Sequence, residues 1–124
     1  GSSGKECLQI NVKDNSAFGS FVQIPAVDGT IEKIEVTIRE PYKGRAIGIF
    51  PVGYTYTKDT LDKMKEQLAK DAIAISNETP SDVNNNEPFT FVIDNLSAKN
   101  LTQFSIFPTL GAVSITAITV TYSK

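Results

Sequence analysis

Apolar and polar side chains alternate most regularly over residues 30–40. The apolar positions of this segment are Ile34, Val36 and Ile38, with charged or hydroxyl residues between them. Because successive side chains on a strand point to opposite faces, the alternation predicts a strand with one buried and one solvated face. Residues 18–27 are predicted to form the preceding strand, and the Asp28-Gly29 pair between the two favours a tight turn. The two strands are therefore expected to fold back on each other as a hairpin.

Five further strands are predicted from apolar stretches bounded by turn residues: residues 6–12, 45–52, 89–93, 101–108 and 113–122. In the last of these, Ile115 is out of phase with Ile118 and Val120. A bulge near Ala117 would restore the burial of Ile115, and the alternatives are that Ile115 is exposed or is covered by a neighbouring segment. Short strands separated by turns in this way predict an all-β fold, an antiparallel β-sandwich of about seven to eight strands.

Residues 58–70 break the strand rhythm and predict one inserted amphipathic helix of about three turns. Leu61, Met64 and Leu68 follow one another at helical spacing, and Asp59 or Thr60 can cap the start. The apolar stripe is expected to pack over one end of the sandwich. The helix would then be a structural plug, and the alternative is a mobile lid over a ligand site.

The length of 124 residues predicts a single domain. We expect this domain to span residues 5–124, because residues 1–4, Gly-Ser-Ser-Gly, resemble a tag or linker remnant. Hydrophobic residues make up 40% and charged residues 21% of the chain, which is typical of a globular protein with its own core. The net charge of −2 offers no attraction for nucleic acid or anionic membranes. No apolar run approaches the ~20 residues of a membrane span, so we expect no nucleic-acid partner and no membrane insertion of this domain.

The chain contains no histidine, and this narrows its chemistry. Neither a Ser-His-Asp or Cys-His triad nor a histidine-ligated zinc site can be built without it. Carboxylates that could form a glycosidase pair are present by type alone: Glu32, Glu35, Asp59, Asp62 and Asp94. Because nothing in the sequence places two of them across a cleft, the chain is expected not to be an enzyme.

Cys7 is the only cysteine, so no disulfide can form within the chain. Its place in the first predicted strand favours a small, buried, apolar residue. The alternative is a reactive thiol, for which Lys5 would be the nearby positive charge.

The polar segment after residue 80 resembles the opening of a calcium-binding loop. Residues 82–86 follow the D-x-N-x-N pattern, but Glu87 replaces the glycine that should come next, and Ile93 occupies the position of the bidentate acid. The segment is therefore not an EF-hand. Asp82, Asn84 and Glu87 are candidates for an irregular structural calcium site, and the alternative is a plain polar loop. No other cofactor is expected.

Three tyrosines fall at predicted turns or strand ends. They are Tyr42, Tyr54 and Tyr56, and Arg45 lies close to the first of them in the chain. A sugar ring needs a flat apolar platform for its C–H face and polar groups for its hydroxyls, and this set offers both. The alternative is that the tyrosines cap the ends of the sandwich core.

The strand pattern resembles that of galactose-binding-like jelly-roll modules. The resemblance rests on the Ile24-Pro25-Ala26-Val27-Asp28-Gly29 stretch with Ile31, Ile34 and Val36 after it, and on the closing segment, residues 115–122. Such modules occur as discoidin-like or carbohydrate-binding-module-like domains of surface and secreted proteins of glycan-degrading gut bacteria. The resemblance implies a jelly-roll sandwich, an extracellular or cell-surface location, and glycan or protein binding at a loop-bearing end. The predicted helix is a departure from this pattern.

Two functional hypotheses follow. The first is a non-catalytic carbohydrate-binding module of a secreted or cell-surface bacterial protein, with Tyr42, Arg45, Tyr54 and Tyr56 as its ligand-binding residues. The second is a structural or adhesive domain that contacts a surface protein partner and binds no small molecule.

Overall fold

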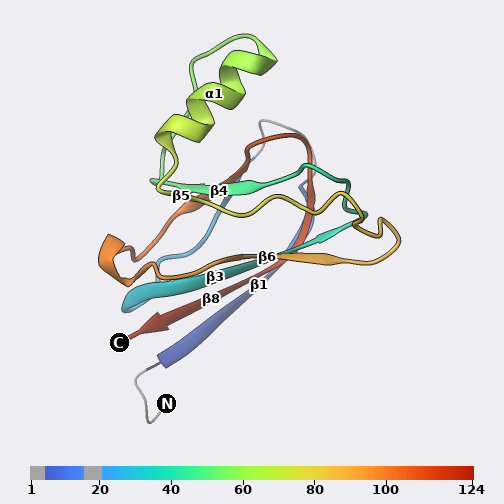
Figure 1. Ribbon diagram of the computed structural model, residues 1–124. Helices are drawn as coiled ribbons and strands as arrows, with labels where there is room; N and C mark the ends of the chain where they lie inside the picture. Colours follow the sequence, from blue (N-terminus) through green and yellow to red (C-terminus); the bar gives the residue numbers. More distant parts are fainter. Residues whose placement is uncertain (1–4, 16–20) are drawn as a thin grey trace.

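Two four-stranded antiparallel sheets form the described part of the chain, which in this computed structural model is residues 5–15 and 21–124 (Figure 1). The first sheet has the order β1 (Lys5–Asn15), β8 (Ser114–Ser123), β3 (Thr30–Arg39) and β6 (Phe89–Ile93). The second has the order β2 (Val22–Gln23), β7 (Ser105–Pro108), β4 (Ile47–Phe50) and β5 (Ala74–Ile75). This is the strand order of a jelly roll, so the predicted jelly-roll β-sandwich is confirmed. Residues 1–4 and 18–20, which carry two of the predictions above, lie outside the described residues.

The main core lies between the two sheets and consists of alternate residues from both. Ile34 and Val36 of β3 and Ile118 of β8 are fully buried, and Ile49 of β4 and Ile106 of β7 meet them from the second sheet. Moving each such side chain from water into the core is worth ~1.5–3 kcal/mol. The alternation predicted over residues 30–40 is therefore confirmed, and it marks a central strand of the first sheet.

The predicted hairpin at Asp28-Gly29 is wrong. The strand before this pair, β2, joins β7 in the second sheet, whereas β3 pairs with β6 and β8 in the first. The turn thus carries the chain from one sheet to the other. A Cβ added at Gly29 would overlap the carbonyl oxygen of Ser123, so the glycine permits a close approach to β8.

The predicted bulge in the last strand is confirmed. Thr37 of β3 lies opposite Ala117, but its neighbour Ile38 lies opposite Ile115, so Thr116 is the extra residue. This one-residue shift returns Ile115 to the core, where only 1% of it is exposed.

Helix α1 (Leu61–Asp71) begins within the predicted segment and is capped by Thr60, whose side chain accepts a hydrogen bond from the backbone N–H of Lys63. Figure 1 shows that its C-terminal end adjoins β4 and β5 on the outside of the second sheet and that its start points away from the sheets. Leu68 is therefore fully buried, whereas Leu61 is 53% exposed. The predicted stripe is correct for its last member and wrong for Leu61, which lies too far from the sheet to be covered.

Leu68 packs on a second, smaller core formed by residues that point away from the main one. Phe50 and Phe107 are buried on the outer face of β4 and β7, next to Ile49 and Ile106 of the main core. The helix covers this outer face rather than an end of the sandwich, and the prediction of an end plug is wrong in that respect.

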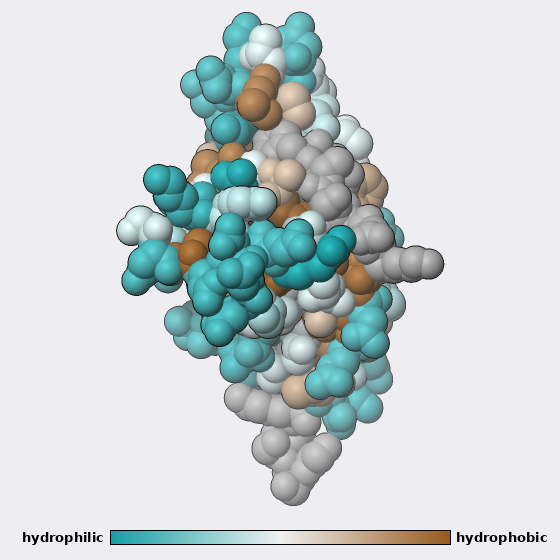
Figure 2. Space-filling view, turned by 90° about the vertical axis from the view of Figure 1, so that its right-hand side faces the viewer, coloured by the Kyte–Doolittle hydropathy of each residue, from teal (hydrophilic) through white to brown (hydrophobic). Residues whose placement is uncertain are grey.

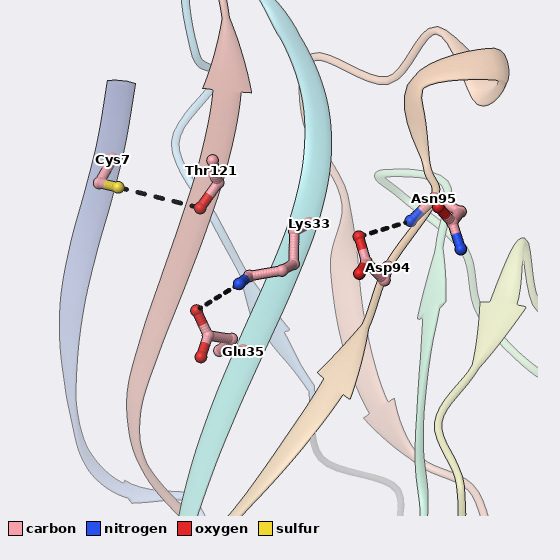
Figure 3. Close-up of polar contacts among 6 residues, drawn as sticks. All are labelled: Cys7, Lys33, Glu35, Asp94, Asn95 and Thr121. Atoms are coloured by element: carbon pink, nitrogen blue, oxygen red, sulfur yellow. Dashed lines mark hydrogen bonds and ion pairs between the residues drawn. The ribbon is translucent and has the colours of Figure 1, made fainter. Parts of the chain in front are cut away.

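Cys7 is exposed on the outer face of the first sheet, which contradicts the prediction of a buried residue. Figure 3 shows its side chain beside Thr121 of β8, with 3.8 Å between Sγ and Oγ1. Leu8, Ile10 and Val12 take the opposite, core-facing side of β1. Cys7, Gln9 and Asn11 therefore face solvent. No helix in the described residues has the length and apolar character to cross a membrane.

Candidate functional site

One end of the sandwich gathers three connections, residues 40–46, 76–88 and 109–113 (Figure 1). Figure 2 shows this end facing the viewer, with hydrophilic residues dominating its surface and hydrophobic ones scattered among them. Tyr42 lies in the first connection with 56% of its surface exposed. An aromatic side chain this exposed at a polar end offers an apolar face to a ligand.

Thr79 fixes the turn that carries Tyr42. Its hydroxyl donates to the carbonyl oxygen of Tyr42 at 2.6 Å and accepts from the backbone N–H of Arg45 at 2.8 Å. Its own N–H donates to the carbonyl oxygen of Arg45 at 2.8 Å. Because Thr79 is only 3% exposed, these bonds are largely shielded from water, and together they fix the conformation of the turn.

The guanidinium of Arg45 lies against the Tyr42 ring, with 5.9 Å between its central carbon and the ring centroid. This is the geometry of a cation–π contact. Its Nε donates to the carbonyl oxygen of Ala112 at 3.2 Å, and Nη1 lies 3.5 Å from that of Lys43. A Cβ at Gly111 would lie 2.8 Å from Arg45 Nε, so the glycine leaves the room that the arginine occupies.

Two shallow hollows share Tyr42 in their walls. One, of about 250 Å³, is lined by Ile38, Arg39, Glu40, Pro41, Tyr42, Ala112, Val113 and Ser114. The other, of about 200 Å³, is lined by Pro41, Tyr42, Lys43, Ser81, Val83 and Asn85. We call Tyr42, Arg45 and the polar residues Lys43, Ser81 and Asn85 the Tyr42 site. It combines an exposed ring with amine, hydroxyl and amide groups.

The other two predicted tyrosines lie elsewhere. Tyr42 and Arg45 precede β4 and Tyr54 and Tyr56 follow it, and its four residues alone span about 13 Å. Tyr54 and Tyr56 are half-buried against the second core, with the Tyr54 ring 4.7 Å from that of Phe50. The structure thus brings together one pair of the four predicted residues and places the other pair beneath α1.

Tyr54 also ties the helix to the sheet, since its hydroxyl donates to the Asp71 carboxylate at 2.8 Å. Burial raises the pKa of Tyr54 to about 12, and the hydrogen bond to Asp71 and its negative charge act in the same direction. The neutral phenol is therefore the form that the fold favours. Gln67 also accepts the backbone N–H of Thr57 at 2.9 Å. These contacts favour the interpretation of α1 as a fixed cover and not as a mobile lid.

A further hollow, of about 750 Å³, lies between residues 57–59 and α1. It is lined by Thr57, Lys58, Asp59, Lys63, Glu66, Gln67, Lys70 and Asp71. Its lining includes three lysines and three acids but no aromatic ring, so it lacks a platform for a sugar. Its mixed charges identify no ligand class.

The residues proposed for calcium lie in the second connection, near the Tyr42 site. Asp82, Asn84 and Glu87 are all exposed. The side-chain oxygen of Asn84 accepts the backbone N–H of Asn86 at 2.9 Å, which shapes the turn. Within residues 5–15 and 21–124, no three histidine, cysteine or acidic side chains are placed to hold a metal ion. The calcium site, which also relies on an asparagine, stays a prediction.

Sequence reasoning missed Thr79, Ser81 and Asn85. Asn85 belongs to the polar run that suggested calcium, so its surface position was foreseeable, but its proximity to Tyr42 was not. Thr79 carries no signal in the sequence, because a threonine in a loop is most often exposed.

No protein-family model and no curated protein matches this chain. Among solved structures, the coat protein dimer of Tobacco streak virus is similar over 98% of this chain and 86% of its own, with a TM-score of 0.53 and 12% identity. The C-terminal carbohydrate-binding module CBM6 of LamC, a marine laminarinase from Zobellia galactanivorans, gives a TM-score of 0.48 and 13% identity over 96% of this chain and 100% of the module. A protein of the disulfide-linked pili of Bacillus endospore appendages gives 0.41 and 14% over 96% and 89%. At 12% identity the coat-protein similarity shows the fold alone.

Proposed function

We propose that this chain is a non-catalytic carbohydrate-binding module of a secreted or cell-surface bacterial protein. The observation that carries the proposal is the Tyr42 ring, 56% exposed and held beside the Arg45 guanidinium at a polar end of the sandwich. Surface display in gut bacteria belongs to the same proposal. Detecting the native protein on intact cells or in culture medium tests that part.

A pyranose ring would stack its C–H face on Tyr42. Its hydroxyls would then reach the polar groups of Lys43, Ser81 and Asn85, which line the hollow beside the ring. One shallow site of this kind predicts affinities between micromolar and millimolar, or about −8 to −4 kcal/mol.

A binding role fits the hollows better than catalysis does. A glycosidase needs two carboxyl groups on opposite sides of the scissile bond. Glu40 is the one acid among the described residues that line the two hollows at Tyr42.

The test is a broad panel of immobilised glycans, screened with the wild-type chain and with Tyr42→Ala, Arg45→Ala and Tyr56→Ala. We expect binding of at least one glycan class, lost in the first two variants and retained in Tyr56→Ala, because Tyr56 packs on the second core. Failure of the wild type to bind any glycan would refute the proposal.

The second candidate is a structural or adhesive domain that contacts a protein. It is favoured by Phe21, which leaves 50% of its surface exposed while its ring stacks on that of Phe107 at 5.1 Å. A glycan panel without any hit would favour this candidate, and binding that depends on Tyr42 would count against it.

A further inference from the structure

The outer edge of β1 is unpaired as far as residues 5–15 and 21–124 show. In the described part of the chain, β1 pairs with β8 on one side and with no strand on the other. It is 11 residues long, whereas β6 at the opposite edge of the same sheet has 5. The backbone N–H and C=O groups along such an edge form a template for another extended strand.

The middle of β1 carries little that protects this edge. The charged residues Lys5, Glu6, Lys13 and Asp14 lie toward the two ends of the strand, and residues 7–12 between them contain no charge, proline or glycine, the features with which proteins usually block edge pairing. At the other edge, β6 is bounded by Pro88 and Asp94. Leu8, Ile10 and Val12 face the core but are only half-buried. A neighbouring strand would cover these three side chains further.

The pattern of β1 matches itself. In an antiparallel pair of two β1 strands centred on Ile10, Leu8 of each copy lies opposite Val12 of the other. On the solvent face, Gln9 lies opposite Asn11. Over residues 8–12, apolar residues therefore meet apolar residues on the core side, and amides meet amides on the outer side. Toward the ends of the pair, this register sets Glu6 opposite Asp14, a like-charge pair that weakens the contact. A contact in which one patch meets its own copy is what a two-fold dimer requires.

We propose that β1 pairs antiparallel with β1 of a second copy of this chain, with Ile10 at the two-fold axis, so that the two first sheets join into one. One pair of strands makes a small contact, so we expect a dimer that forms between about 10 µM and 1 mM. The partner's Cys7 would lie about 20 Å along the strand from Cys7, because this register sets Cys7 opposite Lys13. A separation of this size is too large for a disulfide, so the proposed dimer is not linked through Cys7.

Sedimentation velocity over this concentration range tests the proposal. We expect the wild type to shift from monomer to dimer and Gln9→Lys/Asn11→Lys to stay monomeric, because the variant sets lysines opposite each other on a free edge. Gln9 and Asn11 are exposed, so the fold should survive, and circular dichroism verifies it. The matched control, Thr90→Lys/Val92→Lys, adds the same charge to exposed positions of β6 and should dimerise like the wild type.

A second measurement tests the register. In a Cys7→Ser background, Ile10→Cys should give a disulfide-linked dimer under mild oxidation, while the wild type should give far less. A wild type that remains monomeric at 1 mM, or a Gln9→Lys/Asn11→Lys variant that dimerises as well as the wild type, would overturn the proposal. Efficient linkage through Cys7 would overturn the register. None of these outcomes depends on glycan binding.

Discussion

Thr79 and Tyr42 are 37 positions apart in the chain, yet the Thr79 hydroxyl donates to the Tyr42 carbonyl oxygen at 2.6 Å. The Thr79 hydroxyl oxygen in turn accepts the backbone N–H of Arg45, so one buried side chain orients both residues of the cation–π pair. The Tyr42 site is therefore built from two connections that Thr79 joins through its side chain and its backbone.

The substitution Thr79→Val measures how much this hydrogen bonding contributes to stability. The substitution keeps the shape of the side chain but leaves a buried backbone carbonyl and N–H without their partner, so we expect a loss of about 1–3 kcal/mol in unfolding free energy. Glycan binding should weaken at temperatures where the variant is still folded. Thr90→Val is the control, because Thr90 is exposed and its substitution should change stability by less than about 0.5 kcal/mol. Urea denaturation of both variants provides the comparison, and equal midpoints would contradict the assigned role of Thr79.

The packing of α1 predicts opposite outcomes for two leucines of the same helix. Leu68→Ala removes a fully buried side chain from the second core and should cost about 2–5 kcal/mol. Leu61→Ala removes a side chain that is 53% exposed and should cost less than about 1 kcal/mol. Thermal denaturation of the pair checks this. A larger cost at Leu61 would mean that the helix packs through its first turn instead.

The turn that carries the chain from one sheet to the other requires a glycine at position 29. A Cβ there would overlap the Ser123 carbonyl oxygen, so Gly29→Ala should destabilise by about 1–3 kcal/mol. Gly53→Ala is a useful comparison, because nothing lies within 4 Å of its Cβ position but its φ of 87° disfavours any other residue. We expect a cost of about 1–2 kcal/mol there from the backbone alone. If Gly29→Ala left the unfolding free energy in urea unchanged, this would contradict the close approach of Gly29 to β8.

The ionisation of Tyr54 makes the stability of the fold depend on pH in the alkaline range. Its folded pKa of about 12 lies above the ordinary value of 10.0, so the folded chain retains this proton more strongly than the unfolded chain does. The stability that this provides is fully present below pH 10 and is lost as the pH rises through 12. Tyr54→Phe should therefore show a flatter fall in stability over that window. Denaturation midpoints across this range, with tyrosinate absorbance at 295 nm recorded in parallel, measure the difference, and identical profiles for both chains would contradict it.

Local patterns predicted most of the strands. Residues 89–93 have the predicted limits of β6, and the out-of-phase Ile115 was enough to locate the bulge in β8. Both predictions rest on the alternation of apolar and polar residues, which can be read from residues that are adjacent in the sequence. The Asp28-Gly29 turn was predicted correctly as a turn, but a turn signal does not say which strand comes to lie beside which.

Sequence reasoning reached half of the candidate site. Tyr42 and Arg45 are close in the chain, so their contact could be foreseen, whereas the separation of Tyr54 and Tyr56 depends on where α1 covers the second sheet. Phe50 and Phe107 make that outer face apolar, and a continuous apolar stretch such as residues 46–50 does not reveal that both of its faces are buried. The position of Cys7 was missed for another reason: the general tendency of cysteine to be buried was followed, although the alternation sets Cys7 on the same side as Gln9 and Asn11.

The most direct test of the account is an NMR titration of the 15N-labelled chain with the oligosaccharides that bind best in the glycan panel. The account predicts chemical-shift changes confined to the amides of residues 40–46 and 79–86, and their loss in Tyr42→Ala. Shifts centred on Tyr54 and Tyr56, or no saturable shifts anywhere, would contradict the claim that this end of the jelly roll binds sugar.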